Sequence, residues 1–313
     1  MEETLAGHLT NQPHGGARTP APSSDVARPV SVNFHLWKPC NLDCRFCYAT
    51  FRDLDGSHLS LAESRRLLAM LREAGCDKLT FAGGEPTLCP WLGDLIAEAR
   101  RLCLTTSIVS NGARLRPLLE KRAADIDWIG LSVDSAREDV QRELGRGGGD
   151  YVRRSIELFD LARERNIIVK LNTVVTALSW EEDMTDFVRR VRPKRWKVFQ
   201  VTAIDGQNNG RVEPLLITRE QFQAFVDRHM HLAAEGFEPV AEDNDAILGS
   251  YVMIDPRGRF FGDATGTHVY SDPILDVGVE RALAQVRWDA GKFVKRGGLY
   301  QWRRPPASAG EVL

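Results

Sequence analysis

The chain of 313 residues has no long hydrophobic run. No apolar stretch approaches the ~18 residues that a membrane-spanning helix requires, and the N-terminus lacks the apolar core of a signal peptide. A basic amphipathic helix of the kind that lies on membranes is also missing. We therefore expect a cytoplasmic protein that does not engage a membrane.

The sequence has little excess charge and few cysteines. Its formal net charge is −2, so there is no global signal for nucleic acid, and any site for a polyanion must be local. We expect no nucleic-acid partner and a monomer. The six cysteines do not predict a disulfide framework, because thiols stay reduced in the cytoplasm. A content of 43% hydrophobic and 27% charged residues is ordinary for a globular protein.

Strand-like and helical runs alternate from residue 31 to about residue 235. Repeated βαβ units imply a parallel sheet with right-handed crossovers. Six strands are typical of an open, partial TIM-type barrel, with the active site at the C-terminal strand ends. The fold class is therefore α/β, a partial (β/α)6 barrel. The predicted strands are 32–37, 78–82, 106–109, 128–133, 167–175 and 195–201, and the predicted helices are 60–74, 91–102, 115–124, 151–165, 180–191 and 218–235.

Four segments are expected along the chain. The lead-in is rich in Pro, Gly, Ser and Thr, which is typical of disorder, and the last residues form a flexible tail. Between them lie the barrel and a C-terminal extension with strands at 251–255 and 259–261 and a helix at 274–286. The boundaries are 1–30 for the lead-in, 31–240 for the barrel core, 241–304 for the extension and 305–313 for the tail.

Three cysteines crowd together directly after the first predicted strand. Cys40, Cys44 and Cys47 have the spacing C-x3-C-x2-C. Thiolates are the usual ligands of iron–sulfur clusters, and three of them leave one iron of a [4Fe–4S] cube open. Zinc is the competing metal, but structural zinc needs four ligands, and neither His35 nor His58 has finger-like spacing. The spacing favours a cluster.

The other cysteines are isolated along the chain. Cys76, Cys89 and Cys103 do not pair at ligand spacing, so we expect no second cluster. Each is interpreted as a small hydrophobic residue in the core or near the surface.

The cysteine spacing resembles the signature of the radical S-adenosylmethionine (SAM) superfamily, which also has an aromatic residue before the last cysteine, here Phe46. The stretch Gly83-Gly84-Glu85-Pro86 resembles the family motif that contacts the SAM amino group. The resemblance implies a [4Fe–4S] cluster, SAM and an external one-electron reductant such as flavodoxin or ferredoxin. The implied cofactor-binding residues are Tyr48, Gly83, Gly84, Glu85, Ser110, Asn111, Ser132 and Arg146; a surface-loop role remains open for the last four.

Polar residues recur with a period of two on the predicted strands, so they share one face of the sheet. Lys78, Lys170, Arg195 and Lys197 follow this pattern, together with His35. They would point into the barrel lumen. Buried cations are costly without a counter-charge, and few acidic residues share this face, so we expect an anionic ligand such as a phosphate. The alternative is that each lysine reaches solvent from a strand end.

A second resemblance, to the viperin family of nucleotide dehydratases, runs from Ser31 to Trp302. It rests on Ser-Val-Asn-Phe-His (31–35), Arg-Trp-Lys-Val-Phe-Gln (195–200), Ile-Leu-Asp-Val-Gly-Val-Glu (274–280) and Lys-Arg-Gly-Gly-x-Tyr-x-Trp (295–302). The resemblance implies radical abstraction of the ribose C4′ hydrogen of a nucleoside triphosphate and loss of the 3′-hydroxyl. The product would be a 3′-deoxy-3′,4′-didehydro nucleotide, an antiviral chain terminator.

The viperin resemblance also implies residue roles. Tyr251 would lie near the sugar and supply the final hydrogen or proton; alternatively, it is an ordinary half-buried strand tyrosine. Asn244 would approach the base. Asn33, His35 and Asn172 would line the ribose and phosphate region, and the triphosphate would be held by Lys78, Lys170, Arg195 and Lys197.

The chain departs from the animal proteins in three ways. It lacks their amphipathic helix, His268 stands where they have a lysine near the phosphates, and the base-facing stretch 242–249 differs. A microbial homologue is therefore expected, and the choice among CTP, UTP and GTP stays open. Two alternatives also stay open: a radical SAM enzyme acting on another phosphorylated molecule or a peptide, and a metal-bound interaction module.

Overall fold

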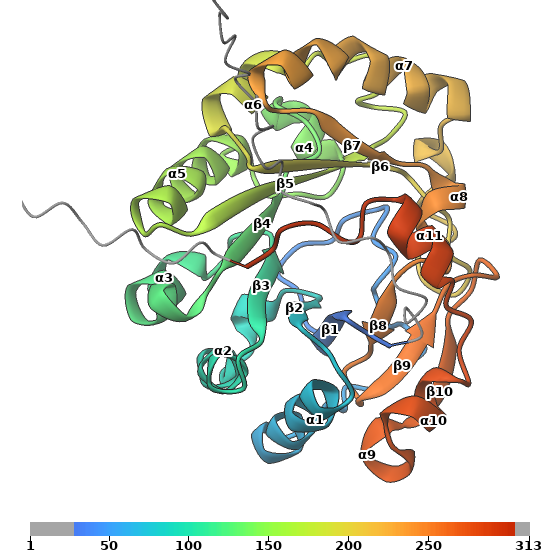
Figure 1. Ribbon diagram of the computed structural model, residues 1–313. Coiled ribbons are helices and arrows are strands. Elements are labelled where there is room, and N and C mark those ends of the chain that lie inside the picture. The colour runs from blue at the N-terminus through green and yellow to red at the C-terminus, as the bar shows by residue number, and fades with distance from the viewer. Residues whose placement is uncertain (1–27, 304–313) are drawn as a thin grey trace, which may run out of the picture.

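The computed structural model describes residues 28–303 and contains one curved ten-stranded sheet (Figure 1). The strand order is β10-β9-β8-β1-β2-β3-β4-β5-β6-β7, and neighbours from β1 to β6 pair in parallel. The predicted α/β class and partial barrel are confirmed. The bounds are β1 Ser31–Trp37, β2 Lys78–Gly83, β3 Thr105–Ser110, β4 Trp128–Ser132, β5 Ile168–Val175 and β6 Arg195–Gln200.

Helices cover the outer face of this sheet (Figure 1). α1 begins at the predicted capping box: the Ser60 hydroxyl accepts a bond from the Glu63 amide, and the Glu63 carboxylate accepts one from the Ser60 amide at 2.8 Å. An unpredicted short helix, α4, follows β4. The bounds are α1 Leu61–Glu73, α2 Leu92–Arg101, α3 Leu115–Arg122, α4 Glu138–Glu143, α5 Tyr151–Glu164, α6 Thr185–Val191 and α7 Arg219–His229.

Four strands that follow β6 along the chain extend both edges of the core sheet. β7 (Pro239–Glu242) pairs in parallel with β6, and β8 (Val252–Ile254) pairs in parallel with β1. β9 (Arg259–Gly262) and β10 (Val269–Pro273) continue from β8 in antiparallel pairs. β7 and β10 were not predicted, because one has only four residues and the other has an interrupted register.

Three predicted helices are wrong in extent. The one at 180–191 starts only at Thr185, and the one at 218–235 is α-helical only to His229 and then tightens into a 3₁₀ helix. The helix at 274–286 is broken by Gly278, whose φ of +87° favours glycine, into α9 (Ile274–Val277) and α10 (Val279–Leu283). Two further helices, α8 (Asn244–Ile247) and α11 (Ala290–Lys295), were not predicted.

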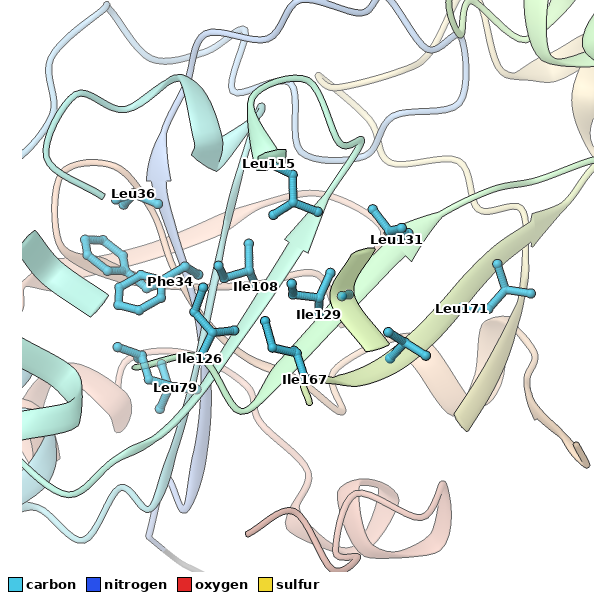
Figure 2. Packing of buried hydrophobic residues seen from close by; sticks show 14 of the residues in the cluster. Phe34, Leu36, Leu79, Ile108, Leu115, Ile126, Ile129, Leu131, Ile167 and Leu171 are labelled. Atoms are coloured by element: carbon cyan, nitrogen blue, oxygen red, sulfur yellow. The ribbon is translucent and has the colours of Figure 1, made fainter. Parts of the chain in front are cut away.

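The main core lies between the sheet and the helices. Figure 2 shows Phe34, Leu79, Ile108 and Leu171 among its residues, each fully buried. Because side chains alternate along a strand, the neighbours of these apolar residues point to the other side of the sheet, into the lumen. Within residues 28–303, no helix is both long and apolar enough to cross a membrane. Residues 1–27 of the predicted lead-in (1–30) and the whole predicted tail (305–313) lie outside the described residues.

We expect Leu171→Ala to lower the free energy of unfolding by about 2–5 kcal/mol, because it leaves a cavity in the packed layer. Leu216→Ala is the matched control: Leu216 is 41% exposed, and its loss should change the stability by less than about 0.5 kcal/mol. Urea denaturation measures both. Equal effects of the two changes would contradict the placement of Leu171 in the packed layer between the sheet and the helices.

Candidate active site

A cavity of about 300 Å³ follows the barrel lumen. The cysteine loop lies at one end of it, after the C-terminal end of β1. Lys78 and Arg195 also line the cavity, and they are the first residues of β2 and β6. The six residues of β2 span roughly 17 Å at about 3.3 Å per residue, so the two ends of the lumen are well separated. The cavity therefore joins two chemically different sites.

Cys40, Cys44 and Cys47 all line the cavity, and they are the only cysteines on its wall in the described part of the chain. Their loop is held by backbone bonds from Arg45 to Leu144 (3.0 Å) and from Cys47 to Cys44 (3.2 Å). Burial raises the pKa of the Cys44 thiol to about 12, so metal binding there must displace a proton.

The donor set fits a cluster rather than a single ion. Within residues 28–303, no three His, Cys, Asp or Glu side chains are placed to hold one metal ion. A cube does not require such convergence, because each thiolate binds a different iron. Three cysteines on the wall would hold three irons and leave the fourth facing the cavity.

The Gly-Gly-Glu loop packs tightly on the residues that precede Cys40. A Cβ added to Gly84 would lie 2.2 Å from the carbonyl oxygen of Lys38 and 2.6 Å from that of Pro39. In addition, the Gly84 amide donates to the Trp37 carbonyl at 2.6 Å. Glycine is thus required at this close approach of two backbones, which sets the position of the cysteine loop.

Glu85 tethers the next loop along the sheet. Its buried carboxylate accepts bonds from the Thr87 amide (3.0 Å), the Ser110 hydroxyl (2.7 Å) and the Asn111 amide (2.8 Å). The Asn111 side-chain amide in turn lies 3.8 Å from the Cys40 sulfur. Glu85 therefore joins the loops after β2 and β3 to the cysteine loop.

Arg146 is buried beside the same end of the cavity. Its guanidinium pairs with Asp134 and donates to the Tyr151 hydroxyl (3.1 Å) and the Ser132 carbonyl (3.4 Å). Asp134 was not predicted. All eight predicted cofactor-binding residues line the cavity: Tyr48, Gly83, Gly84, Glu85, Ser110, Asn111, Ser132 and Arg146.

The predicted lumen lysines Lys78, Lys170 and Lys197 are buried, and Arg195 is half-buried. Lys78 is 5% and Lys170 is 7% exposed, and in residues 28–303 neither these lysines nor Arg195 form an ion pair with a carboxylate. Burial, together with the charge of Arg195 as a smaller cause, lowers the pKa of Lys78 to about 7 and that of Lys170 to about 8. Such uncompensated charge indicates an anionic ligand.

A glycine on the lumen face of β4 makes room for Lys170. A Cβ added to Gly130 would lie 2.9 Å from Cε of Lys170 and 3.2 Å from Nδ2 of Asn172. Asn33 and His35 also line the cavity, and both His35 ring nitrogens are buried without a hydrogen-bond partner, with burial lowering the pKa to about 3. His35 is therefore a neutral ring on the wall.

The expectation that few acidic residues share this face needs one correction. Glu242, the last residue of β7, is fully buried and pairs with Lys197 at 2.5 Å. Its other oxygen accepts a bond from the Tyr251 hydroxyl. Lys197 is thus already compensated, unlike Lys78, Lys170 and Arg195. Glu242 was missed because it ends a four-residue strand with no clear alternation.

The segment that follows α11 crosses the barrel near β4 (Figure 1), and Gly297, Gly298 and Tyr300 of this segment line the cavity. The Lys78 ammonium donates to the Tyr300 hydroxyl, and Arg195 donates to the Gly297 carbonyl at 2.8 Å. The Trp128 ring nitrogen donates to the Trp302 carbonyl at 2.7 Å. Tyr300 was not predicted as a site residue, although the Lys-Arg-Gly-Gly-x-Tyr-x-Trp stretch already marked this segment.

Two residues named from the sequence lie off the cavity wall. Asn244 bonds instead to the Thr202 hydroxyl and to the Val201 carbonyl at 3.4 Å. His268 packs against Phe261, with ring centroids 4.8 Å apart. Neither side chain is placed at the lumen surface.

We expect Gly84→Ala to lose most of the iron that the wild type retains, because the new methyl group would push the cysteine loop away. Iron content and absorbance near 400 nm after anaerobic reconstitution measure this. Gly148→Ala is the control, since nothing lies within 4 Å of a Cβ there. A Gly84→Ala protein with full iron content would contradict the close packing described for this loop.

Comparisons with known proteins identify relatives of this chain. A model of the radical SAM superfamily matches residues 37–191. A protein of Flammeovirga pacifica is 40% identical over 87% of this chain and 96% of its own length. A protein of Lacinutrix mariniflava is 42% identical over 90% of this chain, which spans 60% of that relative. An Oncorhynchus mykiss protein is 34% identical over 90% of this chain and 83% of its own length. All three are named S-adenosylmethionine-dependent nucleotide dehydratases.

Solved structures share the fold at low sequence identity. Streptococcus suis SuiB bound to S-adenosylmethionine has a TM-score of 0.61 at 18% identity, with 75% of this chain and 60% of SuiB covered. The enzyme anSMEcpe with bound AdoMet and a peptide has a TM-score of 0.63 at 13% identity, with coverages of 85% and 82%. These likenesses support the barrel architecture alone.

Proposed function

The chain belongs to the family of S-adenosylmethionine-dependent nucleotide dehydratases, and from this premise we propose that it dehydrates the ribose of a ribonucleoside triphosphate. The observation that carries the proposal is a single cavity with a three-cysteine loop at one end and three uncompensated cations toward the other. A triphosphate would neutralise the cations, and the sugar would then lie between them and the cysteine loop.

The [4Fe–4S] cluster and SAM supply a carbon radical that can abstract a hydrogen atom from the ribose. Cys40, Cys44 and Cys47 would hold the cluster. Glu85 would keep the surrounding loops in place, and Arg146, with its charge met by Asp134, would border the SAM site. An external one-electron reductant is required. The aromatic and cationic wall would exclude bulk water from the sugar.

The product would be the 3′-deoxy-3′,4′-didehydro nucleotide. Loss of the C4′ hydrogen and the 3′-hydroxyl leaves a C3′=C4′ double bond, so no 3′-oxygen remains for chain extension. The phosphate groups would be held by Lys78, Lys170 and Arg195. This set supports a phosphorylated substrate over a peptide, because a peptide would leave the buried cations without a counter-charge.

Anaerobic incubation of reduced, reconstituted protein with SAM and CTP, UTP, GTP or ATP separately tests the proposal. Mass spectrometry should detect 5′-deoxyadenosine and one didehydro nucleotide, and the preferred triphosphate identifies the base. Cys47→Ala is the control without a complete cluster. Deoxyadenosine formation that no nucleotide stimulates would overturn the proposal.

We expect nucleotide binding to take up protons between about pH 7 and pH 9. The pKa values of Lys78 and Lys170 are about 7 and about 8, and a bound triphosphate raises both by attraction. Affinity should therefore fall as the pH rises above 8. Calorimetry at pH 8 in buffers of different ionisation enthalpy measures the uptake. Lys170→Met should reduce the uptake and weaken binding by roughly 10- to 100-fold.

The same lysines predict the opposite pH trend for folding of the ligand-free protein. Their native pKa values lie below the usual 10.5, so the native state binds fewer protons than the unfolded state between about pH 7 and pH 10. Stability should rise with pH across this window, and Lys170→Met should flatten the trend. In the nucleotide-binding experiment, an absence of proton uptake together with a pH-independent nucleotide affinity would show that these lysines do not receive the phosphates.

A further inference from the structure

An unpaired seam separates the two parallel strands at the edges of the barrel. β7 ends the sheet beside β6, and β8 lies on the far side of β1, with no backbone ladder between β7 and β8 in the described residues. Glu242 is the last residue of β7, and Tyr251 directly precedes β8. Side chains rather than backbone groups therefore connect the two strands.

Glu242 is the centre of this connection. Its Oε1 lies 2.5 Å from the Lys197 ammonium and 3.6 Å from the Arg296 guanidinium, and its Oε2 accepts the Tyr251 hydroxyl proton at 2.5 Å. Lys197 also donates to the Tyr251 oxygen. The Arg296 guanidinium stacks on the Tyr251 ring, 3.6 Å from its centroid.

Glu242 does not itself line the cavity, whereas Lys197, Tyr251 and Arg296 all do. Its carboxylate is fully buried behind them. A charge this deep is tolerated because two cations and a phenol satisfy it. The consequence is that three groups on the wall have their orientation set by one carboxylate that the substrate cannot reach.

The dehydration requires a proton at one defined atom. After a C4′ hydrogen atom has been removed, the C3′–O bond breaks, and the departing oxygen takes one proton to leave as water. One electron from the external reductant completes the C3′=C4′ bond. No proton is added to the nucleotide carbons, so the whole acid requirement falls on the leaving oxygen.

Tyr251 and Lys197 are the two candidate proton donors, and the hydrogen bonds that each already makes distinguish them. The single O–H of Tyr251 is already donated to Glu242. The Lys197 ammonium has three N–H bonds; it donates one to the Tyr251 oxygen and forms an ion pair with Glu242 Oε1 at 2.5 Å. The remaining N–H is available to the cavity. Burial among these groups also makes the ammonium a stronger acid than a solvated lysine.

We propose that Lys197 delivers the proton to the leaving 3′-oxygen and that Glu242 is the positioning residue whose charge orients the ammonium and keeps it protonated. The proposal rests on the proposed dehydration and reassigns Lys197 from phosphate binding to proton transfer. Tyr251 is then a second positioning group rather than the proton donor. Phosphate binding is left to Lys78, Lys170 and Arg195.

The charged groups around Lys197 predict how Glu242→Gln changes the pH dependence of product formation. Burial lowers the pKa of Lys197 well below its usual value. Glu242, which faces it from β7, opposes this shift, whereas Arg296 after α11 and Lys170 on β5 add to it; the neutral Tyr251 phenol packs beside the ammonium. Glu242→Gln removes the only carboxylate of this set. The alkaline limb of the pH profile, which is the pH range over which product formation falls as the pH rises, should therefore move to lower pH.

The experiment measures didehydro nucleotide formed per 5′-deoxyadenosine, across pH, with the nucleotide that the wild type prefers. For Glu242→Gln we expect this ratio to fall by about 10²-fold at pH 8, with the limb displaced and nucleotide affinity within about threefold of the wild type. Asp255→Asn is the matched control, because Asp255 is also fully buried and paired with an arginine, Arg259, but lies off the cavity. It should leave both the ratio and the limb unchanged.

Two further variants make the result decisive. Glu242→Asp keeps the negative charge on a shorter side chain. It should lower the ratio of didehydro nucleotide to 5′-deoxyadenosine without moving the alkaline limb of the pH profile. It replaces Glu242→Gln if the Glu242→Gln protein does not fold. Tyr251→Phe should retain product formation at a reduced rate. Complete loss of product in Tyr251→Phe would assign the proton to the phenol instead, and an unmoved limb in Glu242→Gln would exclude the positioning role. A wild type that forms no didehydro nucleotide would overturn the proposed function itself, a separate outcome.

Discussion

The burial of positive charge inside the barrel is the constraint on which the other features depend. Lys78, Lys170 and Arg195 alternate with apolar residues on their strands, so the sheet that packs Leu79, Leu171 and Trp196 against helices must turn these cations inward. Their charge has no carboxylate partner within residues 28–303. A protein carries such a cost where a ligand offsets it.

The two ends of the cavity carry different groups because the core strands run in the same direction. Loops after the C-terminal ends of β1 to β4 carry the cysteines, Glu85 and Arg146, whereas the cations at the starts of β2 and β6 lie toward the other end. The C-terminal segment contacts these cations through Tyr300 and Gly297. Because every strand of the parallel core runs the same way, one lumen can present radical chemistry at one end and anion binding at the other.

The seam between β7 and β8 shows a different use of charge. There Lys197 and Arg296 share the carboxylate of Glu242, so they are compensated before any ligand arrives. The compensated pair and the uncompensated set therefore have different functions, even though both consist of buried cations on one wall. The fold places the compensated group where the sheet lacks a backbone ladder, and side chains rather than main-chain bonds hold that gap together.

Local sequence was sufficient for the cysteine loop, the six core strands and the inward cations, because metal-ligand spacing and period-two alternation are properties of short segments. It also indicated the glycines of the Gly-Gly-Glu loop, although their close contact with Lys38 and Pro39 depends on two strands lying side by side. Glu242, Asp134 and Tyr300 could not be assigned in this way. Each acquires its role from a partner far along the chain or on another strand, and only the closed barrel brings those partners within hydrogen-bonding distance. Charge compensation, which separates Lys197 from Lys170, is a property of that three-dimensional neighbourhood and not of the strand on which either lysine lies.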